Sequence, residues 1–192
     1  LNMHMTDSIY CNGDNTGGVG MNISGGHSPY MISWSVSGSG DTLTGLPSGL
    51  YMVTVTDSVQ CIREDSIYVS EPAVLSTQIQ ITDTISCYTY RDASLTVSVS
   101  GGTGSYSYLW SDGSLTNTSD SLGAGSHNVI VTDVNGCMTS DSVVLSDPIG
   151  MHMHVSMLDS VKCYGENTGQ AFAYVSNMPP ASISYEWSNG EM

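Results

Sequence analysis

Basic residues are nearly absent from this sequence of 192 residues. It has three Lys and Arg residues against 18 Asp and Glu residues, which gives a formal net charge of −15 at pH 7. Nucleic acid and anionic lipid are bound by clustered Lys and Arg side chains, so we expect neither as a partner. The acidity favours solubility of an exposed protein, and it leaves calcium binding as an alternative.

Long apolar runs are missing as well. No segment approaches the roughly 20 apolar residues of a membrane span, so no membrane insertion is expected. No signal peptide is visible, and the chain opens at Leu1 inside an expected strand, so we expect both ends to be cut from something longer. Helix-favouring residues are scarce, while Ser, Thr, Gly, Val and Tyr dominate, which is typical of short strands joined by tight turns.

The sequence also lacks the common signatures of catalysis. It contains no G-x-S-x-G, no H-E-x-x-H and no phosphate-binding Gly loop, because the glycines at 17–20 precede no expected helix. No C-x-x-C pair or nearby Cys/His cluster indicates zinc. We therefore predict that the protein is not an enzyme and has no catalytic residues, no metal ligands and no cofactor.

What the sequence does contain is an internal repeat of 76 residues. Cys11, Cys87 and Cys163 follow each other at this interval, and so do Cys61 and Cys137. Trp34 and Trp110 keep the same interval, and Trp187 follows after 77 residues. The chain therefore holds two full repeats and the first part of a third, with boundaries predicted at 1–72, 73–148 and 149–192.

Apolar residues alternate with polar ones along several short segments of each repeat. Residues 51–55 and 127–131 are examples, and Gly, Pro and Asx turns separate such runs. The pattern predicts an all-β fold of tandem Ig-like β-sandwiches in a linear array. We expect each Trp to lie in the core between the two sheets.

The joints between repeats are short and carry proline. They read Ser-Glu-Pro-Ala at 70–73 and Ser-Asp-Pro-Ile at 146–149, and strands are expected to resume directly on both sides. Such joints leave little freedom between neighbours, so we predict a semi-rigid rod.

The cysteines indicate an oxidising compartment. Within a repeat the two cysteines are 50 residues apart, one after the opening strand and one before the closing strand. We predict the internal disulfides Cys11–Cys61 and Cys87–Cys137, with the partner of Cys163 outside the sequence near position 213. Paired cysteines place the protein in the periplasm or outside the cell.

Several motifs together resemble the SprB repeat, found in large surface proteins of gliding and related Bacteroidetes bacteria. The first repeat reads Cys-Asn-Gly-Asp-Asn-Thr-Gly at 11–17, Leu-Pro-Ser-Gly-Leu-Tyr at 46–51 and Val-Thr-Val-Thr-Asp at 53–57. The third keeps Cys-Tyr-Gly-Glu-Asn-Thr-Gly at 163–169, whereas the second reads Cys-Tyr-Thr-Tyr-Arg-Asp-Ala at 87–93. The resemblance implies type IX secretion, display on the cell surface, and a role in adhesion, gliding motility or filament building.

An Asp followed by Ser or Thr and then an aliphatic residue occurs eight times, although the chain has only 13 Asp. The triplet resembles the O-glycosylation sequon of Bacteroidetes, so we predict a glycoprotein. The alternative is that Asp and Ser favour turns and aliphatic residues start strands. The candidate hydroxyls belong to Ser8, Thr42, Ser58, Ser66, Thr84, Ser121, Ser142 and Ser160.

The function predicted from these features is a structural or adhesive extracellular stalk or filament. Its expected partners are neighbouring repeats, identical chains and surface polysaccharide. One alternative is a carbohydrate- or ligand-binding module, for which the best candidates are Tyr10, Tyr88 and Tyr164, each adjacent to the first cysteine of a repeat. Another is a pilus-like subunit that polymerises by strand exchange at an open sheet edge.

Overall fold

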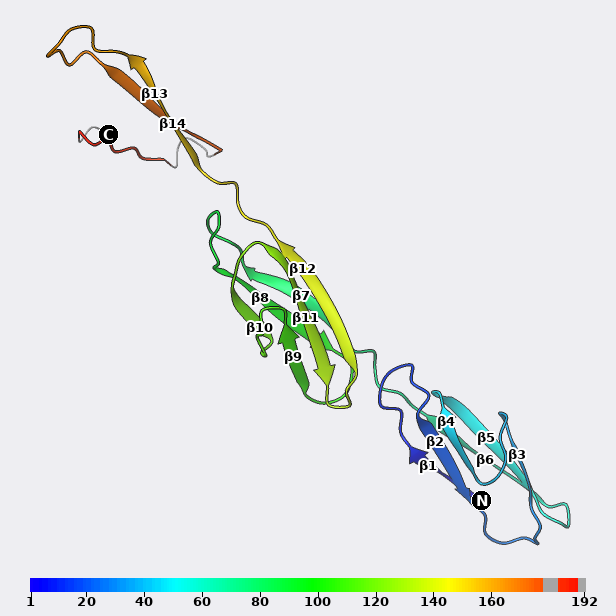
Figure 1. Ribbon diagram of the computed structural model, residues 1–192. Helices are drawn as coiled ribbons and strands as arrows, with labels where there is room; N and C mark the ends of the chain where they lie inside the picture. Colours follow the sequence, from blue (N-terminus) through cyan, green and yellow to red (C-terminus); the bar gives the residue numbers. More distant parts are fainter. Residues whose placement is uncertain (178–182, 190–192) are drawn as a thin grey trace. The chain divides into compact units, whose positions relative to one another are not determined.

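The computed structural model describes residues 1–177 and 183–189, and all regular structure in these two ranges is β-strand. None of the described residues forms a helix of the length and apolar character that crossing a membrane requires. The strands (Figure 1) are β1 (Asn2–Asp7), β2 (Gly17–Asn22), β3 (Met31–Trp34), β4 (Thr42–Leu46), β5 (Gly49–Thr56), β6 (Ile62–Val69), β7 (Ser76–Asp83), β8 (Ala93–Ser100), β9 (Tyr106–Trp110), β10 (Thr118–Leu122), β11 (Gly125–Asp133), β12 (Met138–Leu145), β13 (His152–Asp159) and β14 (Gln170–Ser176).

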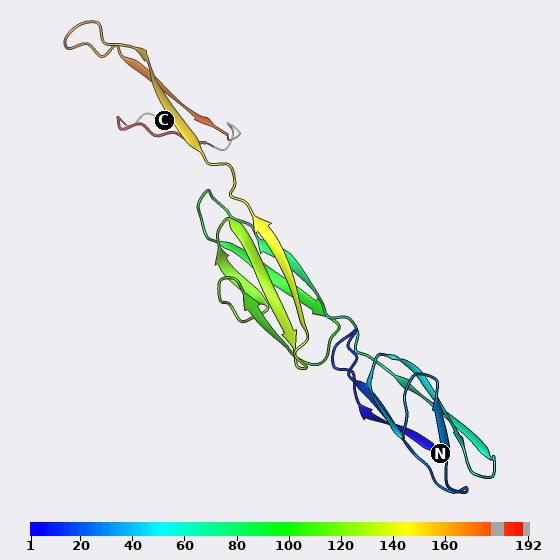
Figure 2. The same ribbon diagram turned by 45° about the vertical axis from the view of Figure 1, so that its right-hand side comes forward.

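The first six strands form two antiparallel sheets, ordered β1-β2-β4 and β3-β5-β6 (Figures 1 and 2). Both sheets contribute to one hydrophobic core, with Val19 and Met21 from the first sheet and Val53 and Val55 from the second. Because each sheet buries one face, the two form the layers around this core.

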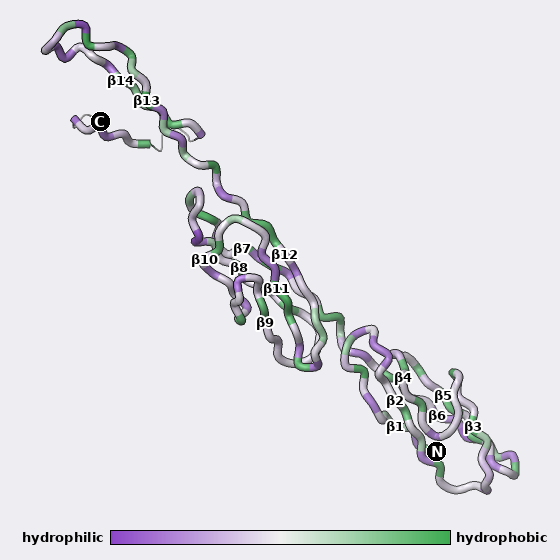
Figure 3. Tube along the Cα trace, viewed as in Figure 1, coloured by the Kyte–Doolittle hydropathy of each residue, from purple (hydrophilic) through white to green (hydrophobic). Residues whose placement is uncertain are grey.

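Alternation along the strands explains which side chains enter the core. In β5 the side chains of Tyr51, Val53 and Val55 are buried, and Met52 between them is exposed. Successive side chains of a strand point to opposite faces, so this period of two gives one dry and one wet face. Figure 3 accordingly shows hydrophobic and hydrophilic residues mixed along the labelled strands.

The expected place in the core is confirmed for Trp34 and Trp110, whereas Trp187 is half-buried and lies outside the strands. Trp34 is 8% exposed and Trp110 is 3% exposed. Their indole Nε1–H groups donate to the carbonyl oxygens of Gly40 and Thr116, at 3.0 and 2.9 Å. A buried Trp needs a partner for this donor, and the two residues meet the need in the same way.

The next six strands follow the first six at the sequence interval of 76. They form sheets ordered β10-β8-β7 and β12-β11-β9. Strands β4 and β10 differ by this interval at both ends, as do β6 and β12. Leu95, Val97, Val129 and Val131 are buried in β8 and β11. Equivalent sequence segments therefore form equivalent strands.

An aspartate of β6 is hydrogen-bonded to the backbone of β1. The amide of Met3 donates to Asp65 Oδ2 at 2.9 Å, and the amide of Ile79 donates to Asp141 Oδ2 at 2.8 Å. In the first repeat this bond links an edge strand of each sheet, because β1 and β6 lie at edges of different sheets. A carboxylate that accepts from the backbone satisfies an amide that an edge strand leaves unpaired.

Strands β13 and β14 form a two-stranded antiparallel sheet, with Val155 opposite Ala173. All side chains of β13 are exposed. The predicted third repeat, residues 149–192, lies partly outside the described residues. The three predicted repeat boundaries stay predictions, and "first repeat" and "second repeat" below denote residues 1–72 and 73–148.

Candidate functional site

The disulfide joins Cys11 to Cys137. Their Cα atoms are 5.6 Å apart and the two residues are 126 positions apart in the sequence. Cys61, Cys87 and Cys163 are free and exposed. The predicted pairs Cys11–Cys61 and Cys87–Cys137 are therefore wrong, and so is the expectation of one internal disulfide in each repeat.

Two kinds of loop carry the cysteines. The exit loops, residues 11–14, 87–90 and 163–166, each begin with a cysteine. In the first repeat this loop lies beside the point where the chain leaves the repeat. The hairpin loops, residues 57–61 and 133–137, each end with a cysteine and connect β5 to β6 and β11 to β12.

The length of β6 explains why Cys11 does not pair with Cys61. The amide of Gly13 donates to Glu71 Oε2 at 2.7 Å, so the exit loop lies beyond the C-terminal end of β6. Cys61 immediately precedes the N-terminal end of this eight-residue strand. Eight residues at about 3.3 Å each span about 26 Å, whereas a disulfide requires Cα atoms within about 7 Å.

Asp57 organises the hairpin loop of the first repeat. Its Oδ1 accepts hydrogen bonds from the amides of Val59 and Cys61, at 3.0 and 2.8 Å. Its Oδ2 accepts from the amide of His27 at 3.1 Å. The N–H of Cys61 is the largest cause that lowers the pKa of Asp57 below its ordinary value of 3.8, and burial opposes this shift. The carboxylate thus fixes the backbone position of the cysteine.

Asp133 does the same in the second repeat. Its Oδ1 accepts from the amides of Asn135 and Cys137, at 2.9 and 3.0 Å, and its Oδ2 accepts from Thr103 at 2.8 Å. Burial acts to raise the pKa of Asp133, but these hydrogen bonds outweigh it and the pKa lies below 3.8. The bonded Cys137 and the free Cys61 are therefore presented by the same loop structure.

The exit loops share a tight turn. The backbone amide three residues after each cysteine donates to the cysteine carbonyl, from Asp14 to Cys11 at 3.1 Å, from Tyr90 to Cys87 at 2.9 Å and from Glu166 to Cys163 at 3.3 Å. The third residue of each turn has a positive φ: 82° at Gly13, 65° at Thr89 and 85° at Gly165. Thr89 is the one non-glycine residue of the three.

A polar contact accompanies the disulfide. The side-chain amide Nδ2 of Asn135 donates to the carbonyl oxygen of Tyr10 at 3.1 Å. The Sγ atom of Cys137 lies 3.3 Å from the same oxygen. Asn135 is not among the site residues predicted from the sequence, although its place in the Asn-Gly-Cys motif beside Cys137 is a usable signal.

All eight candidate glycosylation hydroxyls are exposed. Their triplets also have structural roles, because Asp57, Asp65 and Asp141 accept backbone hydrogen bonds. The aliphatic third residue is buried in four triplets, at Ile9, Leu43, Ile85 and Leu122. Exposure of the hydroxyl is what glycosylation requires, and it also follows from strand alternation, so glycosylation stays a prediction.

The acidic residues do not gather into a metal site in the part of the chain that the structure describes. No three His, Cys, Asp or Glu side chains come together there as possible ligands. The carboxylates of Asp57 and Asp133 each accept three backbone hydrogen bonds, so their contacts in this structure are with the loop backbone.

Comparison with solved structures finds a C-terminal 282-residue fragment of intimin in complex with the intimin-binding domain of the translocated intimin receptor. The two chains are 10% identical with a TM-score of 0.41, and the similarity covers 82% of this chain. This chain spans 66% of the length of that fragment. No curated protein matches this sequence.

The resemblance drawn from the sequence is tested by a family comparison. The matched segment runs from β7 through the exit loop of Cys87 and β8 to just after β9. It therefore includes one cysteine-bearing loop and the buried Trp110. The model of the SprB repeat matches residues 80–115, and the resemblance to this family is confirmed for that segment.

Proposed function

We propose that this protein is a section of a structural or adhesive stalk on the cell surface, built from tandem Ig-like β-sandwich repeats. The single observation that carries the proposal is the Cys11–Cys137 bond, which joins a loop of the first repeat to a loop of the second. The peptide chain already links the two repeats, and the disulfide adds a limit on how far the chain between Cys11 and Cys137 can extend when it is pulled. That property suits a protein that transmits force outside the cell, where disulfides persist.

The SprB match over residues 80–115 supports the same function. It favours a non-enzymatic surface module, and secretion by the type IX pathway with a role in gliding or filament building belongs to the proposal. The partners proposed are neighbouring repeats, identical chains and surface polysaccharide. The net charge of −15 agrees with a solvated, exposed chain.

Surface labelling of intact cells tests the location. Antibodies raised against the chain should label intact cells that produce it, and a protease added outside should remove the label. A control antibody against a cytoplasmic protein should label only broken cells. Labelling that appears only after the cells are broken would contradict the proposal.

Glycosylation is a separate part of the proposal. The eight exposed hydroxyls, among them Ser8 and Thr42, should carry extra mass in glycopeptides of the native protein. Asp7→Asn and Asp41→Asn should remove the mass at these two sites while the other sites keep it. Bare hydroxyls at all eight sites would remove glycosylation from the account.

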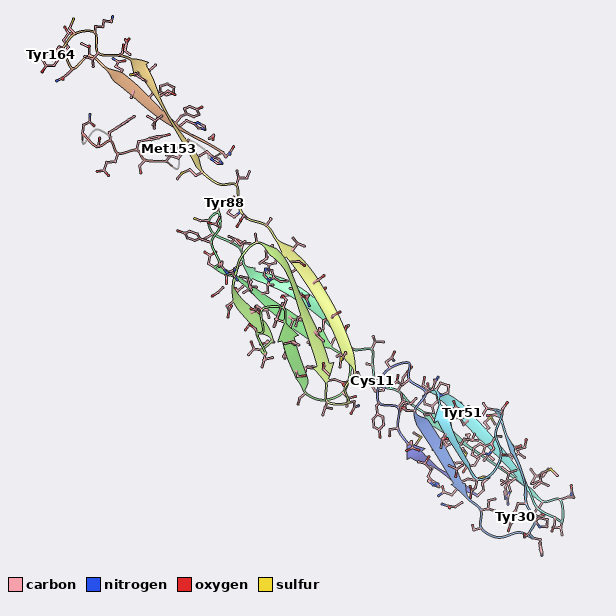
Figure 4. All side chains as sticks on the ribbon, viewed as in Figure 1. Cys11, Tyr30, Tyr51, Tyr88, Met153 and Tyr164 are labelled. Atoms are coloured by element: carbon pink, nitrogen blue, oxygen red, sulfur yellow. A yellow bond between two sulfur atoms is a disulfide. The ribbon has the colours of Figure 1, made fainter. Side chains whose placement is uncertain are left out.

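A ligand-binding module is a second candidate function. Tyr88 and Tyr164 are 76 residues apart and each follows a cysteine, whereas Tyr10 precedes Cys11. All three are exposed. Figure 4 shows Tyr88 and Tyr164 on loops outside the sheets. Exposed aromatic rings are the usual platforms for sugars. A glycan array that shows specific binding, lost on changing the three tyrosines to alanine, would favour this function over a purely structural one.

A further inference from the structure

Three cysteines remain free, and each lies in a loop of a kind that forms a disulfide elsewhere in this chain. Cys61 ends a hairpin loop, and Cys87 and Cys163 begin exit loops. All three are exposed. Since the observed bond joins an exit loop to a hairpin loop, the free cysteines comprise both complementary types.

The hairpin loop of Cys61 has the geometry of the bonded loop. The amide of Cys61 donates to Asp57 Oδ1 at 2.8 Å, and the amide of Cys137 donates to Asp133 Oδ1 at 3.0 Å. In both loops a further amide donates to the aspartate carbonyl, from Gln60 and from Gly136. The backbone therefore presents Cys61 as it presents the bonded Cys137.

The exit loop of Cys87 is anchored like that of Cys11. The amide of Gly13 donates to Glu71 Oε2 at 2.7 Å, and the amide of Thr89 donates to Asp147 Oδ1 at 3.2 Å. In each case the acidic residue precedes the proline of the joint. The free thiol of Cys87 therefore lies beside the joint that follows the second repeat.

We propose that Cys61, Cys87 and Cys163 each form a further disulfide with an adjoining repeat. Each such bond would join an exit loop to a hairpin loop, and we call each of these cysteines a half-site. The proposal rests on the repeat architecture proposed above and adds a rule of covalent assembly. An exit-loop cysteine pairs with the hairpin-loop cysteine of the repeat that follows it. For the chain on its own in solution, a second copy supplies the complementary loop, so that its Cys61 accepts Cys163 of the first copy. The same interval of 126 residues places the partner of Cys87 outside the sequence.

The pairing rule follows from geometry. Cys11 and Cys61 lie at opposite ends of β6, so the two half-sites of one repeat face different neighbours. Contacts between unlike surfaces run head to tail and do not close on themselves. Two exit loops should therefore not bond to each other, and neither should two hairpin loops, because the Cys11–Cys137 bond joins one loop of each kind.

Each new bond requires an oxidant, and a small-molecule disulfide supplies it. The thiolate of Cys61 attacks one sulfur of oxidised glutathione, which forms a mixed disulfide and releases one glutathione thiolate. The exit-loop thiolate of the first copy then attacks the Cys61 sulfur of the second copy and releases the second glutathione. Two protein thiols lose two electrons and two protons in total, and one glutathione disulfide becomes two glutathione thiols.

The test uses the full chain in a buffer of oxidised and reduced glutathione, followed by non-reducing gels and mass mapping of the cross-linked peptides. We expect covalent oligomers in which Cys61 of one copy is joined to Cys163 of another. Cys61→Ser should lose these oligomers completely, because it leaves only exit-loop thiols. Cys163→Ser should lose them as well, whereas the matched control Cys87→Ser should keep them.

Unselective oxidation gives a different pattern, because exposed thiols of like type then pair with each other. Oligomers that persist in Cys61→Ser, or that join Cys61 to Cys61, would overturn the proposal, as would the absence of oligomers from the unaltered chain. Peptide mapping of the intact Cys11–Cys137 bond controls for folding of each variant. The outcome is independent of surface labelling, so failure of the pairing rule is distinguishable from failure of the proposed function.

Discussion

Cys11 and Cys137 are joined by a disulfide although 126 residues separate them in the sequence. The bond connects an exit loop to a hairpin loop, and each loop belongs to a different repeat. It therefore encloses most of both repeats in a single covalent ring. While the bond is intact, a pulling force passes through the disulfide. Unfolding of either repeat therefore cannot extend the chain between Cys11 and Cys137.

Stretching single molecules by their two ends tests this consequence. With the bond intact, the residues between Cys11 and Cys137 stay outside the extended path. Reduction should add 126 residues to it, or about 430 Å of contour length. Cys11→Ser should give the longer value with or without reductant. Equal lengths for the oxidised and reduced chain would contradict the bond.

Stability should fall in acid because the folded chain holds Asp57 and Asp133 in the charged form. Both pKa values are lowered below 3.8, so the folded state binds protons less readily than the unfolded state. Their contribution is present above pH 3.8 and is lost as the pH falls through the lowered values. Thermal unfolding between pH 6 and pH 2.5 should show this loss.

The double variant Asp57→Asn/Asp133→Asn controls the acid experiment. It should unfold at a lower temperature at pH 6 and show a flatter dependence on pH. Part of the dependence should remain, because hydrogen bonds also lower the pKa of Asp92 and Asp112. A pH profile unchanged from that of the original chain would contradict the role of these two carboxylates.

Thr89→Gly should stabilise the second repeat. Thr89 has a φ of 65°, in the left-handed region that disfavours β-branched residues, and the equivalent residue of the first repeat is Gly13. The change should raise the free energy of unfolding by about 1 kcal/mol. Gly13→Thr should lower it, although a Cβ at Gly13 would meet no atom within 4 Å. Chemical denaturation of both variants measures the difference, and equal effects of one sign would contradict backbone strain.

Leu95→Ala should lower the free energy of unfolding by about 2–5 kcal/mol. Leu95 lies in β8 with 0% of its surface exposed. Leu109→Ala is the matched control. Leu109 lies in β9, the next strand along the chain, and is 51% exposed, so its truncation leaves no cavity. Denaturant titrations that show similar losses for both would contradict the assignment of the core.

Much of the fold is readable in the sequence because burial follows alternation. The segment 51–55 predicts β5 and its inward side chains, and the buried Trp34 and Trp110 follow from the same reasoning. The strand turns at Asn135-Gly136 and at residues 46–49 are set by local chemistry as well. These features depend on neighbouring residues, which a sequence displays directly.

The disulfide depends on a different kind of information. A spacing of 50 residues brings two cysteines together only if the intervening strands return the chain to the same end of the sheets. Alternation identifies β2 to β5 as strands, but it does not show at which end of the sheet each strand begins. The chain reaches the hairpin loop at the far end of β6, and the interval of 126, one repeat plus 50, gives the correct pair.

Peptide mapping without reduction tests the central claim most directly, and the few basic residues make it simple. Trypsin cuts after Arg63, Arg91 and Lys162, which places Cys11 in fragment 1–63 and Cys137 in fragment 92–162. The account predicts that these two fragments are joined, and that a second digestion traces the bond to Cys11. Fragment 64–91 joined to 92–162, with Cys11 bonded to Cys61 inside fragment 1–63, would contradict it.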